Sequence, residues 1–320
     1  MYVVRRDGRR LRRVGSSTAN PRALDWRATG SDPVIAAAGD ISCDPASASF
    51  NGGLGTGKRC AELTVSNALL RMDLSAVLAL GDIQYEDGRL SKFLQSFDPT
   101  WGRLKPLIRP VPGNHEYRTP GAGGYFDYFN GDRNDGAAGV RGLGYYSFDV
   151  GRWHLVALNS ECANGSPGTS APACAVGSPQ ERWLRADLAA HPRACTLAFF
   201  HHPLLASGLR MRNDGIMPLW QALADGGADV VLVGHDHAYE RFAPIDAAGA
   251  LDRVRGLREF VVGTGGKSLR RARWHAPNSQ FRQNRAPGLL ELTLHPTGYG
   301  WRFVSAVTGA ALDAGSSTCH

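Results

Sequence analysis

Four apolar runs along the chain each end in a short polar turn. The runs cover residues 34–38, 76–80, 195–200 and 230–233. The turns that follow are Gly-Asp at 39–40, Gly-Asp at 81–82, His-His at 201–202 and Gly-His-Asp-His at 234–237. Short apolar runs separated by helical segments are typical of strands that are buried on both faces of a sheet. The pattern therefore predicts four buried strands with polar side chains at their ends.

Between these runs, the spacing of apolar residues predicts helices at residues 61–72, 90–97, 179–191 and 216–225. The third helix begins with a capping box, Ser178-Pro179-Gln180-Glu181. A hairpin is expected around the turn at residues 151–152, and a long surface excursion with a small aromatic helix at 118–143. The β-rich end of the chain indicates a second, more antiparallel sheet. No linker or repeat interrupts this order, which predicts one domain over residues 33–320.

The first thirteen residues hold six arginines and one aspartate and carry much of the formal net charge of +7. We expect a flexible, basic N-terminal segment over residues 1–32 that is solvated and does not bind nucleic acid, since it lacks interleaved aromatic residues. No apolar run approaches the length of about 18 residues that a membrane-spanning helix needs. The segment also lacks the apolar region of a signal peptide, so an exported protein would have lost its signal or have a misassigned start.

The six cysteines indicate an oxidising, extracytoplasmic compartment. Cys43 and Cys60 bracket a Gly/Ser-rich loop, and Cys162 and Cys174 bracket another loop of small residues. Such loops have little to pack, so a disulfide would limit their freedom, and we predict both pairs. Cys195 and Cys319 either pair with each other or leave Cys195 as a buried thiol.

The Gly-rich stretch VVGTGGKS at residues 261–268 is similar to a phosphate-binding loop. The motif requires a glycine five positions before Gly266, where this chain has Val261. We therefore expect neither this stretch nor GGLGTG at 52–57 to bind a nucleotide.

Polar side chains at the strand ends form the candidate site. They are Asp40, Asp82, Tyr85, Asn114, His115, His201, His202, His235 and His237. Ligands of open α/β sheets bind beyond the carboxyl ends of the strands, so these side chains can meet there. Two carboxylates, an amide, a phenol and at least three imidazoles exceed the needs of one tetrahedral zinc ion. They suit two metal ions about 3.5–4 Å apart, with one carboxylate between them.

Five motifs occur in order: Gly-Asp at 39–40, G-D-x-x-Y at 81–85, G-N-H-E at 113–116, H-x-P at 201–203 and G-H-x-H-A-Y-E-R at 234–241. Over residues 34–242 this set resembles the calcineurin-like metallophosphoesterases, and within them the bacterial, single-domain form of the purple acid phosphatase branch. The resemblance implies an α/β (α+β) fold, a four-layer αββα sandwich of two mixed β-sheets flanked by helices. Most superfamily members carry a histidine where this chain has Ser42, and Tyr85 is placed to replace that ligand.

The resemblance also implies the ligands of each metal ion. The first ion, Fe(III), takes Asp40, Asp82, Tyr85 and His237. The second, Zn(II), Fe(II) or Mn(II), takes Asp82, Asn114, His201 and His235. A phenolate is a hard, anionic ligand that suits Fe(III), and Asp82 bridges the two ions.

The remaining motif residues receive supporting roles. His115 is expected to face the substrate as a catalytic residue, where it steadies the phosphate or protonates the leaving oxygen. His202 is a second catalytic candidate that either lines the pocket or supports the ligands. Glu116, Glu240 and Arg241 are expected to orient the histidines by hydrogen bonds.

The implied function is a secreted, acid phosphatase-like hydrolase that cleaves phosphate monoesters by direct attack of a metal-bound hydroxide. Its partners would be a small phosphorylated substrate and inorganic phosphate, as product or inhibitor. A phosphodiesterase acting on nucleotides or other diesters is the alternative within the enzyme class. A non-catalytic phosphate-binding or nucleic-acid-binding protein is the alternative outside it, and it would tolerate losses among the seven ligand positions, all of which are filled here.

Overall fold

The computed structural model describes residues 32–320, except 57–58, 165–172, 194, 209–210 and 272–273. The basic segment predicted for residues 1–32 therefore lies, except for Asp32, outside the described residues. Asp32–His320 form one compact unit. In the described parts of the chain, no helix is long and apolar enough to cross a membrane.

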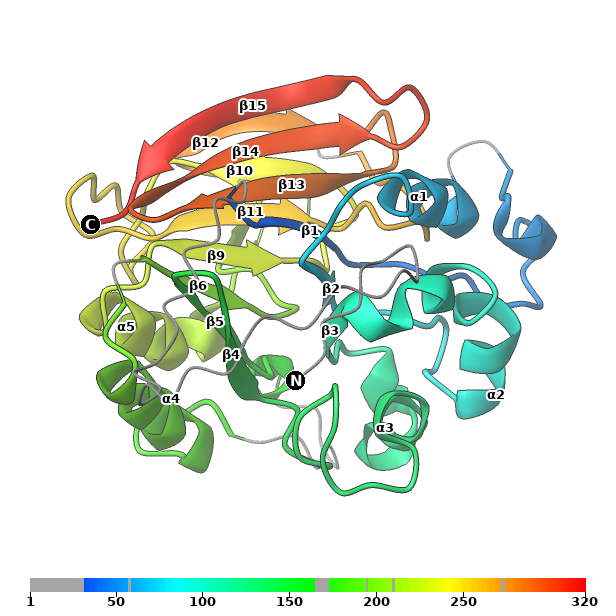
Figure 1. The fold of residues 1–320 in the computed structure, drawn as a ribbon, viewed down its shortest axis with the longest axis horizontal. Helices are drawn as coiled ribbons and strands as arrows, with labels where there is room; N and C mark the ends of the chain where they lie inside the picture. Colours follow the sequence, from blue (N-terminus) through cyan, green and yellow to red (C-terminus); the bar gives the residue numbers. More distant parts are fainter. Residues whose placement is uncertain (1–31, 57–58, 165–172, 194, 209–210, 272–273) are drawn as a thin grey trace, which may run out of the picture. The chain divides into compact units, whose positions relative to one another are not determined.

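Two β-sheets form the centre of this unit (Figure 1). The first has six strands in the order β15 (Ala311–Thr318), β14 (Gly298–Ser305), β13 (Gly288–His295), β1 (Val34–Ala38), β2 (Ala76–Leu80) and β3 (Ile108–Val111). The second has seven in the order β12 (Ser279–Gln283), β10 (Tyr239–Phe242), β11 (Arg258–Val262), β9 (Val230–Val233), β6 (Cys195–Phe199), β5 (Trp153–Ala157) and β4 (Tyr146–Val150). A separate two-stranded ribbon pairs β7 (Leu205–Ala206) with β8 (Met211–Arg212).

The four apolar runs of the sequence form β1, β2, β6 and β9. Every residue of β2, β6 and β9 is buried, as expected for strands covered on both faces. β1, β2 and β3 are parallel to one another, and so are β5, β6, β9 and β11. Parallel pairing places the carboxyl ends of these strands, with their polar turns, at one edge of each sheet.

The C-terminal strands differ from the expectation of a separate antiparallel sheet. β13 pairs antiparallel with β1, so β13, β14 and β15 extend the first sheet, while β10, β11 and β12 belong to the second. In β13, Leu290, Leu292 and Leu294 are buried and alternate with less buried residues. This alternation gives the strand one apolar face, which joins the main core. Both sheets are consequently mixed.

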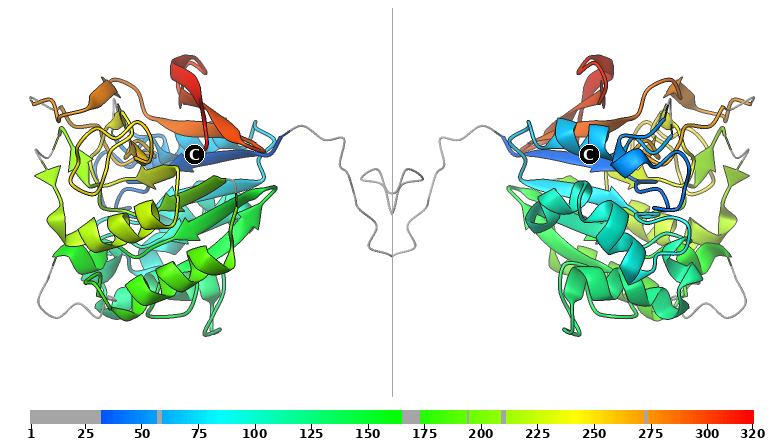
Figure 2. Two further views of the ribbon diagram at one scale, coloured as in Figure 1. Left: turned by 90° about the vertical axis from the view of Figure 1, so that its left-hand side faces the viewer. Right: turned by 90° about the vertical axis from the view of Figure 1, so that its right-hand side faces the viewer.

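Helices cover the outer face of each sheet. Against the first sheet lie α1 (Glu62–Leu69), α2 (Leu90–Lys92) and α3 (Gly123–Asn130), and against the second lie α4 (Pro179–Ala190) and α5 (Met217–Asp225). Figure 2 shows the two helical layers from opposite sides. Short 3-10 turns lie at Asn51–Gly53, Trp101–Leu107, Glu116–Arg118, Pro120–Ala122, Glu161–Asn164 and Asp214–Ile216, and Phe93–Phe97 is a π-helical turn. The structure confirms the predicted four-layer αββα sandwich.

The aromatic helix α3 corrects the expected surface excursion at residues 118–143. Tyr125, Phe126, Tyr128 and Phe129 are all buried. The ring of Tyr128 stacks on that of Phe93, with 5.0 Å between centroids. Only Asp127 of this helix is exposed, and its four aromatic side chains pack into the core, so this part of the excursion does not lie in solvent.

Three disulfides are present in the described residues. They are Cys43–Cys60, Cys162–Cys174 and Cys195–Cys319, with Cα–Cα distances of 5.4, 5.5 and 5.5 Å. The first two are the predicted pairs, and the third resolves the open alternative for Cys195 by joining β6 to the end of the chain. The structure leaves no free cysteine.

These pairings predict that the denatured, unreduced protein takes up no thiol-alkylating reagent. After reduction, all six cysteines should react. Intact-mass spectrometry before and after reduction measures both states. Label on any unreduced molecule would show a free thiol and contradict the three pairings.

Candidate metal centre

The side chains of the site are aimed by abrupt turns at the strand ends. Asp40 after β1, Asp82 after β2 and His235 after β9 all have positive φ angles, of 57, 47 and 69°. Residues other than glycine seldom take this left-handed conformation, which occurs preferentially at functional sites. Each strand thus turns sharply as it ends, and the three side chains converge at one edge of the two sheets.

Glycines allow the loops to approach one another closely. A Cβ atom on Gly81 would lie 2.6 Å from Nδ1 of His201, and one on Gly113 would lie 2.4 Å from Oδ1 of Asp82. Both distances are too short for any side chain. The glycine before Asp82 and the glycine before Asn114 are therefore required for the site to form.

Four candidate ligand atoms from Asp40, Asp82, Tyr85 and His237 converge in one group. Oη of Tyr85 lies 2.7 Å from Oδ1 of Asp40 and 2.9 Å from Oδ2 of Asp82. Nε2 of His237 lies 3.1 Å from Oη of Tyr85 and 3.1 Å from Oδ1 of Asp40. We call these four residues the tyrosine group.

A second group lies next to it and shares Asp82. Nε2 of His201 lies 3.4 Å from Oδ1 of Asp82 and 3.2 Å from Nδ1 of His235. We call Asp82, Asn114, His201 and His235 the histidine group. Oδ2 of Asp82 thus faces the tyrosine group and Oδ1 faces the histidine group, so one carboxylate lies between two sets of ligand atoms.

Burial and mutual charge set the ionisation of these side chains. Burial alone would raise the pKa of Asp82, but His201 holds it well below its usual range. Burial likewise opposes ionisation of Asp40, and His237 more than offsets it, so the pKa of Asp40 is lowered. Burial, together with the charge of the neighbouring His201, lowers the pKa of His235 to about 4. The site therefore holds two ionised carboxylates in a buried position.

The phenol of Tyr85 is the exception to this pattern of charge. Burial raises its pKa well above the usual value, and the charges of Asp40 and Asp82 raise it further. Without an added positive charge, Tyr85 stays neutral between two carboxylates. A cation among these oxygens would reverse that balance and favour the phenolate.

The donor set fits metal ions. Oδ1 of Asn114 is buried and has no hydrogen-bond partner among the described residues, although a buried amide oxygen is normally satisfied. Candidate ligand atoms of Asp40, Asp82 and His201 lie within 4.8 Å of one another, and so do those of His201, His202 and His235. Carboxylate, phenol, amide and imidazole donors in this arrangement suit iron, zinc or manganese.

Comparison with known proteins identifies the family. The family model described as calcineurin-like phosphoesterase matches residues 35–239, which is more than half of the chain. The chain belongs to the calcineurin-like phosphoesterase family. The matched region contains β1 to β9 with every candidate ligand, and it ends within β10.

Individual relatives of the chain include purple acid phosphatases. It is 28% identical over 193 residues to an uncharacterized protein of Mycobacterium tuberculosis, covering 52% of this chain and 36% of the relative. Purple acid phosphatase 21 of Arabidopsis thaliana is 28% identical over 237 residues, covering 67% of this chain and 50% of the relative. The chain thus spans half or less of the length of these relatives.

A solved structure shares the fold. The purple acid phosphatase PPD1 from seeds of yellow lupin (Lupinus luteus) has a TM-score of 0.70 at 19% identity, covering 90% of this chain and 54% of that one. This structure confirms the fold, and the sequence relatives bear out the resemblance to the purple acid phosphatase branch that the motifs predict.

The two catalytic candidates predicted from the sequence, His115 and His202, lie in different surroundings. The side chain of His115 is 11% exposed, and its ring lies 4.1 Å from that of Tyr85 between centroids. His202 is fully buried, with Nδ1 3.1 Å from Oγ of Ser160 and its ring 4.5 Å from that of His235. His202 is therefore enclosed beside His235, whereas the side chain of His115 is partly exposed.

The hydrogen bonds of Glu116 differ from the expectation that it orients a histidine. Its carboxylate accepts from the backbone N–H groups of Ile83, Gln84 and Gly113, at 2.9, 3.0 and 2.8 Å. It therefore fastens the loop of Asp82 to the loop of Asn114. These three backbone N–H groups satisfy the buried carboxylate, so Glu116 does not need a hydrogen bond from an imidazole.

The hydrogen bonds of Glu240 and Arg241 also differ from the expectation that these residues orient the histidines. Glu240 accepts from the backbone N–H and the hydroxyl of Ser207, at 3.0 and 2.5 Å. Arg241 pairs with Asp313 of β15, with Nε 2.8 Å from Oδ2. Successive residues of β10 point to opposite faces of the sheet, so Glu240 reaches Ser207 on one face and Arg241 reaches Asp313 on the other.

Groups that the sequence analysis missed hold the imidazoles instead. Nδ1 of His201 donates to the backbone carbonyl of Leu80, at 2.8 Å, and Nδ1 of His237 lies 2.9 Å from Oγ of Ser268. Ser268 belongs to the Gly-rich stretch at 261–268, and Lys267 beside it donates its backbone N–H to the carbonyl of Asp40. The stretch follows β11, which is parallel to β9, and this position at the same sheet edge is the signal that could have revealed it.

Proposed function

We propose that this chain is a dinuclear-metal phosphatase that hydrolyses small phosphate monoesters. The observation that carries the proposal is the position of Asp82, whose two oxygens face the two ligand groups. Fe(III) would bind the tyrosine group, and Zn(II), Fe(II) or Mn(II) would bind the histidine group. When bound, two such ions lower the pKa of a coordinated water and neutralise the phosphate oxygens.

The protein's own contribution is to orient the ligands. Since a carbonyl oxygen only accepts, Nδ1–H of His201 is fixed on Leu80, and Nε2 is the ring atom that faces Asp82 and His235. Loss of the Nε2 proton would free a lone pair there for a metal ion. The turn at Asp82 is held from the outside by Glu116. With ligands fixed in this way, little reorganisation accompanies metal binding or turnover.

His115 is placed to handle a proton at the substrate. Its Nδ1 lies 2.6 Å from the backbone carbonyl of Glu86 and must donate to it. Nε2 is therefore the atom that can carry the exchangeable proton, and it lies 3.8 Å from Oδ2 of Asp82. An Nε2–H at this edge of the centre can donate to the leaving oxygen of an ester.

The metal centre and the disulfides also suggest a substrate class and a compartment. The substrate would be a small phosphorylated molecule, with inorganic phosphate as product or inhibitor. Three disulfides favour an extracytoplasmic protein, since such bonds persist in oxidising compartments.

Hydrolysis of p-nitrophenyl phosphate and bis-p-nitrophenyl phosphate by the purified protein tests the proposed activity. We expect faster hydrolysis of the monoester, loss of activity with a chelator, and recovery with added metal. Preference for the diester would assign the chain to phosphodiesterases. Failure to hydrolyse either ester with two metal ions bound would contradict the proposal.

Tyr85→Phe tests the identity of the first ion. With Fe(III) at the tyrosine group, the wild-type protein should absorb visible light through a tyrosinate–Fe(III) transition, and the variant should lose that band. Tyr239→Phe is a matched control, because Tyr239 is equally buried but lies in β10, where its hydroxyl donates to Asp313. An iron-containing protein whose band persists in Tyr85→Phe would remove Tyr85 from the ligand set.

A further inference from the structure

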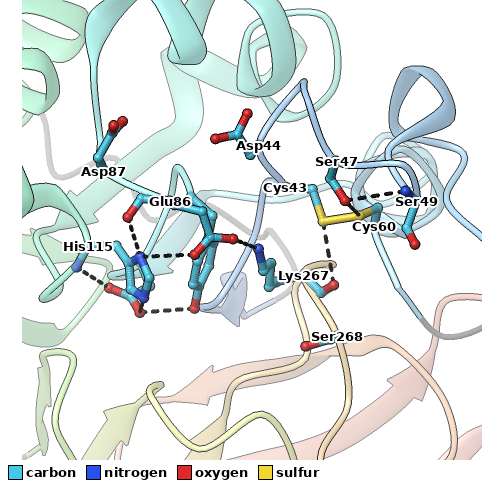
Figure 3. Close-up of polar contacts among 12 residues, drawn as sticks. Cys43, Asp44, Ser47, Ser49, Cys60, Glu86, Asp87, His115, Lys267 and Ser268 are labelled. Atoms are coloured by element: carbon cyan, nitrogen blue, oxygen red, sulfur yellow. Dashed lines mark hydrogen bonds and ion pairs between the residues drawn. A yellow bond between two sulfur atoms is a disulfide. The ribbon is translucent and has the colours of Figure 1, made fainter.

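A set of charged side chains surrounds the metal centre without belonging to the ligand groups. Lys267 lies on the loop after β11, Glu86 follows Tyr85, and His115 and Arg118 follow β3. We call Glu86, Arg118 and Lys267 the charged rim. Figure 3 shows Glu86 between His115 and Lys267, with their polar contacts.

Lys267 is held in a fixed position over the phenol of Tyr85. Its Nζ lies 4.4 Å from the centroid of the Tyr85 ring and forms an ion pair with the carboxylate of Glu86. The backbone of Lys267 donates to the carbonyl of Asp40, at 2.9 Å, and accepts from the N–H of Cys60, at 3.0 Å. Since the Oη of Tyr85 belongs to the tyrosine group, the ammonium group lies about one aromatic ring away from the metal centre.

The carboxylate of Glu86 lies between the two cations of the charged rim. One carboxylate oxygen pairs with Lys267, and the other lies 3.8 Å from Nη1 of Arg118 and 3.9 Å from Nδ1 of His115. Its side chain is 49% exposed, and that of Arg118 is 51% exposed, whereas that of Lys267 is only 17% exposed. The half-exposed Glu86 carboxylate can rotate into solvent and be replaced by another anion, and its contact with Arg118 is an exposed ion pair of little stability.

Two nearby acids, Asp44 and Asp87, have other partners than Lys267. Asp44 and Asp87 both pair with Lys92, at 2.7 and 3.0 Å, and Asp87 also pairs with Arg89, at 3.1 Å. If the Glu86 side chain rotates into solvent, Lys267 and Arg118 are left as two cations with no carboxylate between them. Two such cations beside a phosphatase centre match an anionic substituent on the substrate.

We propose that Lys267 and Arg118 bind a second anionic group of the substrate, in the position that the Glu86 carboxylate takes in this structure. The inference rests on the proposed function and narrows its substrate class. The preferred substrates are phosphate monoesters that carry a carboxylate or a second phosphate a few bonds from the scissile ester.

Binding of two non-hydrolysable ligands tests the proposal independently of turnover. Methylphosphonate has one anionic group, and phosphonoacetate adds a carboxylate. Calorimetry on the metal-loaded protein should give about tenfold tighter binding of phosphonoacetate, the effect of one charge-assisted contact. Lys267→Met should bring the two dissociation constants to within about twofold, and Glu86→Gln should widen their ratio about threefold.

Lys105→Met is the matched control for the loss of a lysine. Nζ of Lys105 lies 4.0 Å from the centroid of the Tyr128 ring and donates to the carbonyl of Tyr128, away from the ligand groups. This variant should keep the preference for phosphonoacetate. Arg118→Gln, at a half-exposed position that tolerates substitution, should reduce the preference in the same direction as Lys267→Met. A preference that survives both rim variants would show that metal ions alone recognise the carboxylate and would overturn the proposal.

Kinetics with O-phosphoserine and O-phosphoethanolamine, which differ by one carboxylate, extend the test to hydrolysis. The ratio of their kcat/KM values should fall at least about fivefold in Lys267→Met. A sugar bisphosphate compared with its monophosphate shows whether a phosphate serves better than a carboxylate. Equal losses on all substrates would place Lys267 at the scissile phosphate and refute the inference. Failure to hydrolyse any ester would refute the proposed function, while the binding ratio would still decide the inference.

Discussion

Asp82→Asn should lower kcat/KM for phosphate monoesters by about a thousandfold or more, because it removes several kcal/mol of transition-state charge stabilisation. The substitution is conservative in shape. Asparagine tolerates the positive φ of 47° at this position, and its amide oxygen can still accept the N–H of His115. Only the negative charge and one anionic oxygen are lost. The purified variant should therefore hold fewer than two metal ions per chain, as measured by elemental analysis.

Asp313→Asn is the control for removing a buried carboxylate. Asp313 pairs with Arg241 and accepts from the hydroxyl of Tyr239, at 2.7 Å, but touches no candidate ligand. This variant should lose stability and retain both metal ions. An Asp82→Asn protein that stays fully loaded and active would refute the position of Asp82 between two metal ions.

His115→Asn should lower kcat by about 10²–10³-fold for alkyl phosphates, with metal content unchanged. The loss should depend on the leaving group. An alkoxide needs a proton as the P–O bond breaks, whereas 2,4-dinitrophenolate leaves without one. The variant should therefore hydrolyse 2,4-dinitrophenyl phosphate at nearly the wild-type rate. Burial lowers the pKa of His115 against the opposing charge of Asp82, so the protonated imidazole that acts as a general acid is favoured at acidic pH.

His295→Asn serves as the comparison for His115, because His295 lies at the end of β13 with Asp32 as its partner. It should retain full activity on both substrates. Equal losses for alkyl and dinitrophenyl phosphates in His115→Asn would show that His115 binds the phosphate and does not protonate the leaving group.

The sequence was most informative where a strand ends in a polar turn. Each apolar run became a buried strand, and Asp40, Asp82 and His235 follow directly, so their convergence could be predicted from the topology rule for parallel strands. Asn114 and Tyr85 could be added only through the resemblance, since a turn asparagine or a loop tyrosine has no distinctive pattern by itself.

Contacts between distant segments could not be predicted in this way. The stretch at 261–268 lacks the glycine pattern of a phosphate loop, yet the pairing of β11 with β9 brings Ser268 to His237 and Lys267 to Tyr85. Glu240 and Arg241 adjoin the histidines in sequence, but strand alternation carries their side chains away from them. Partners of this kind depend on sheet order and register, which periodicity does not encode.

The most direct test of the dinuclear centre is the metal content of the purified protein, measured on the same sample as hydrolysis of p-nitrophenyl phosphate. Two metal ions per chain are predicted, with activity that falls in proportion as a chelator removes them and returns when they are restored. Hydrolysis that persists in fully metal-free protein, or an active protein that never binds more than one ion, would contradict the two-ion account.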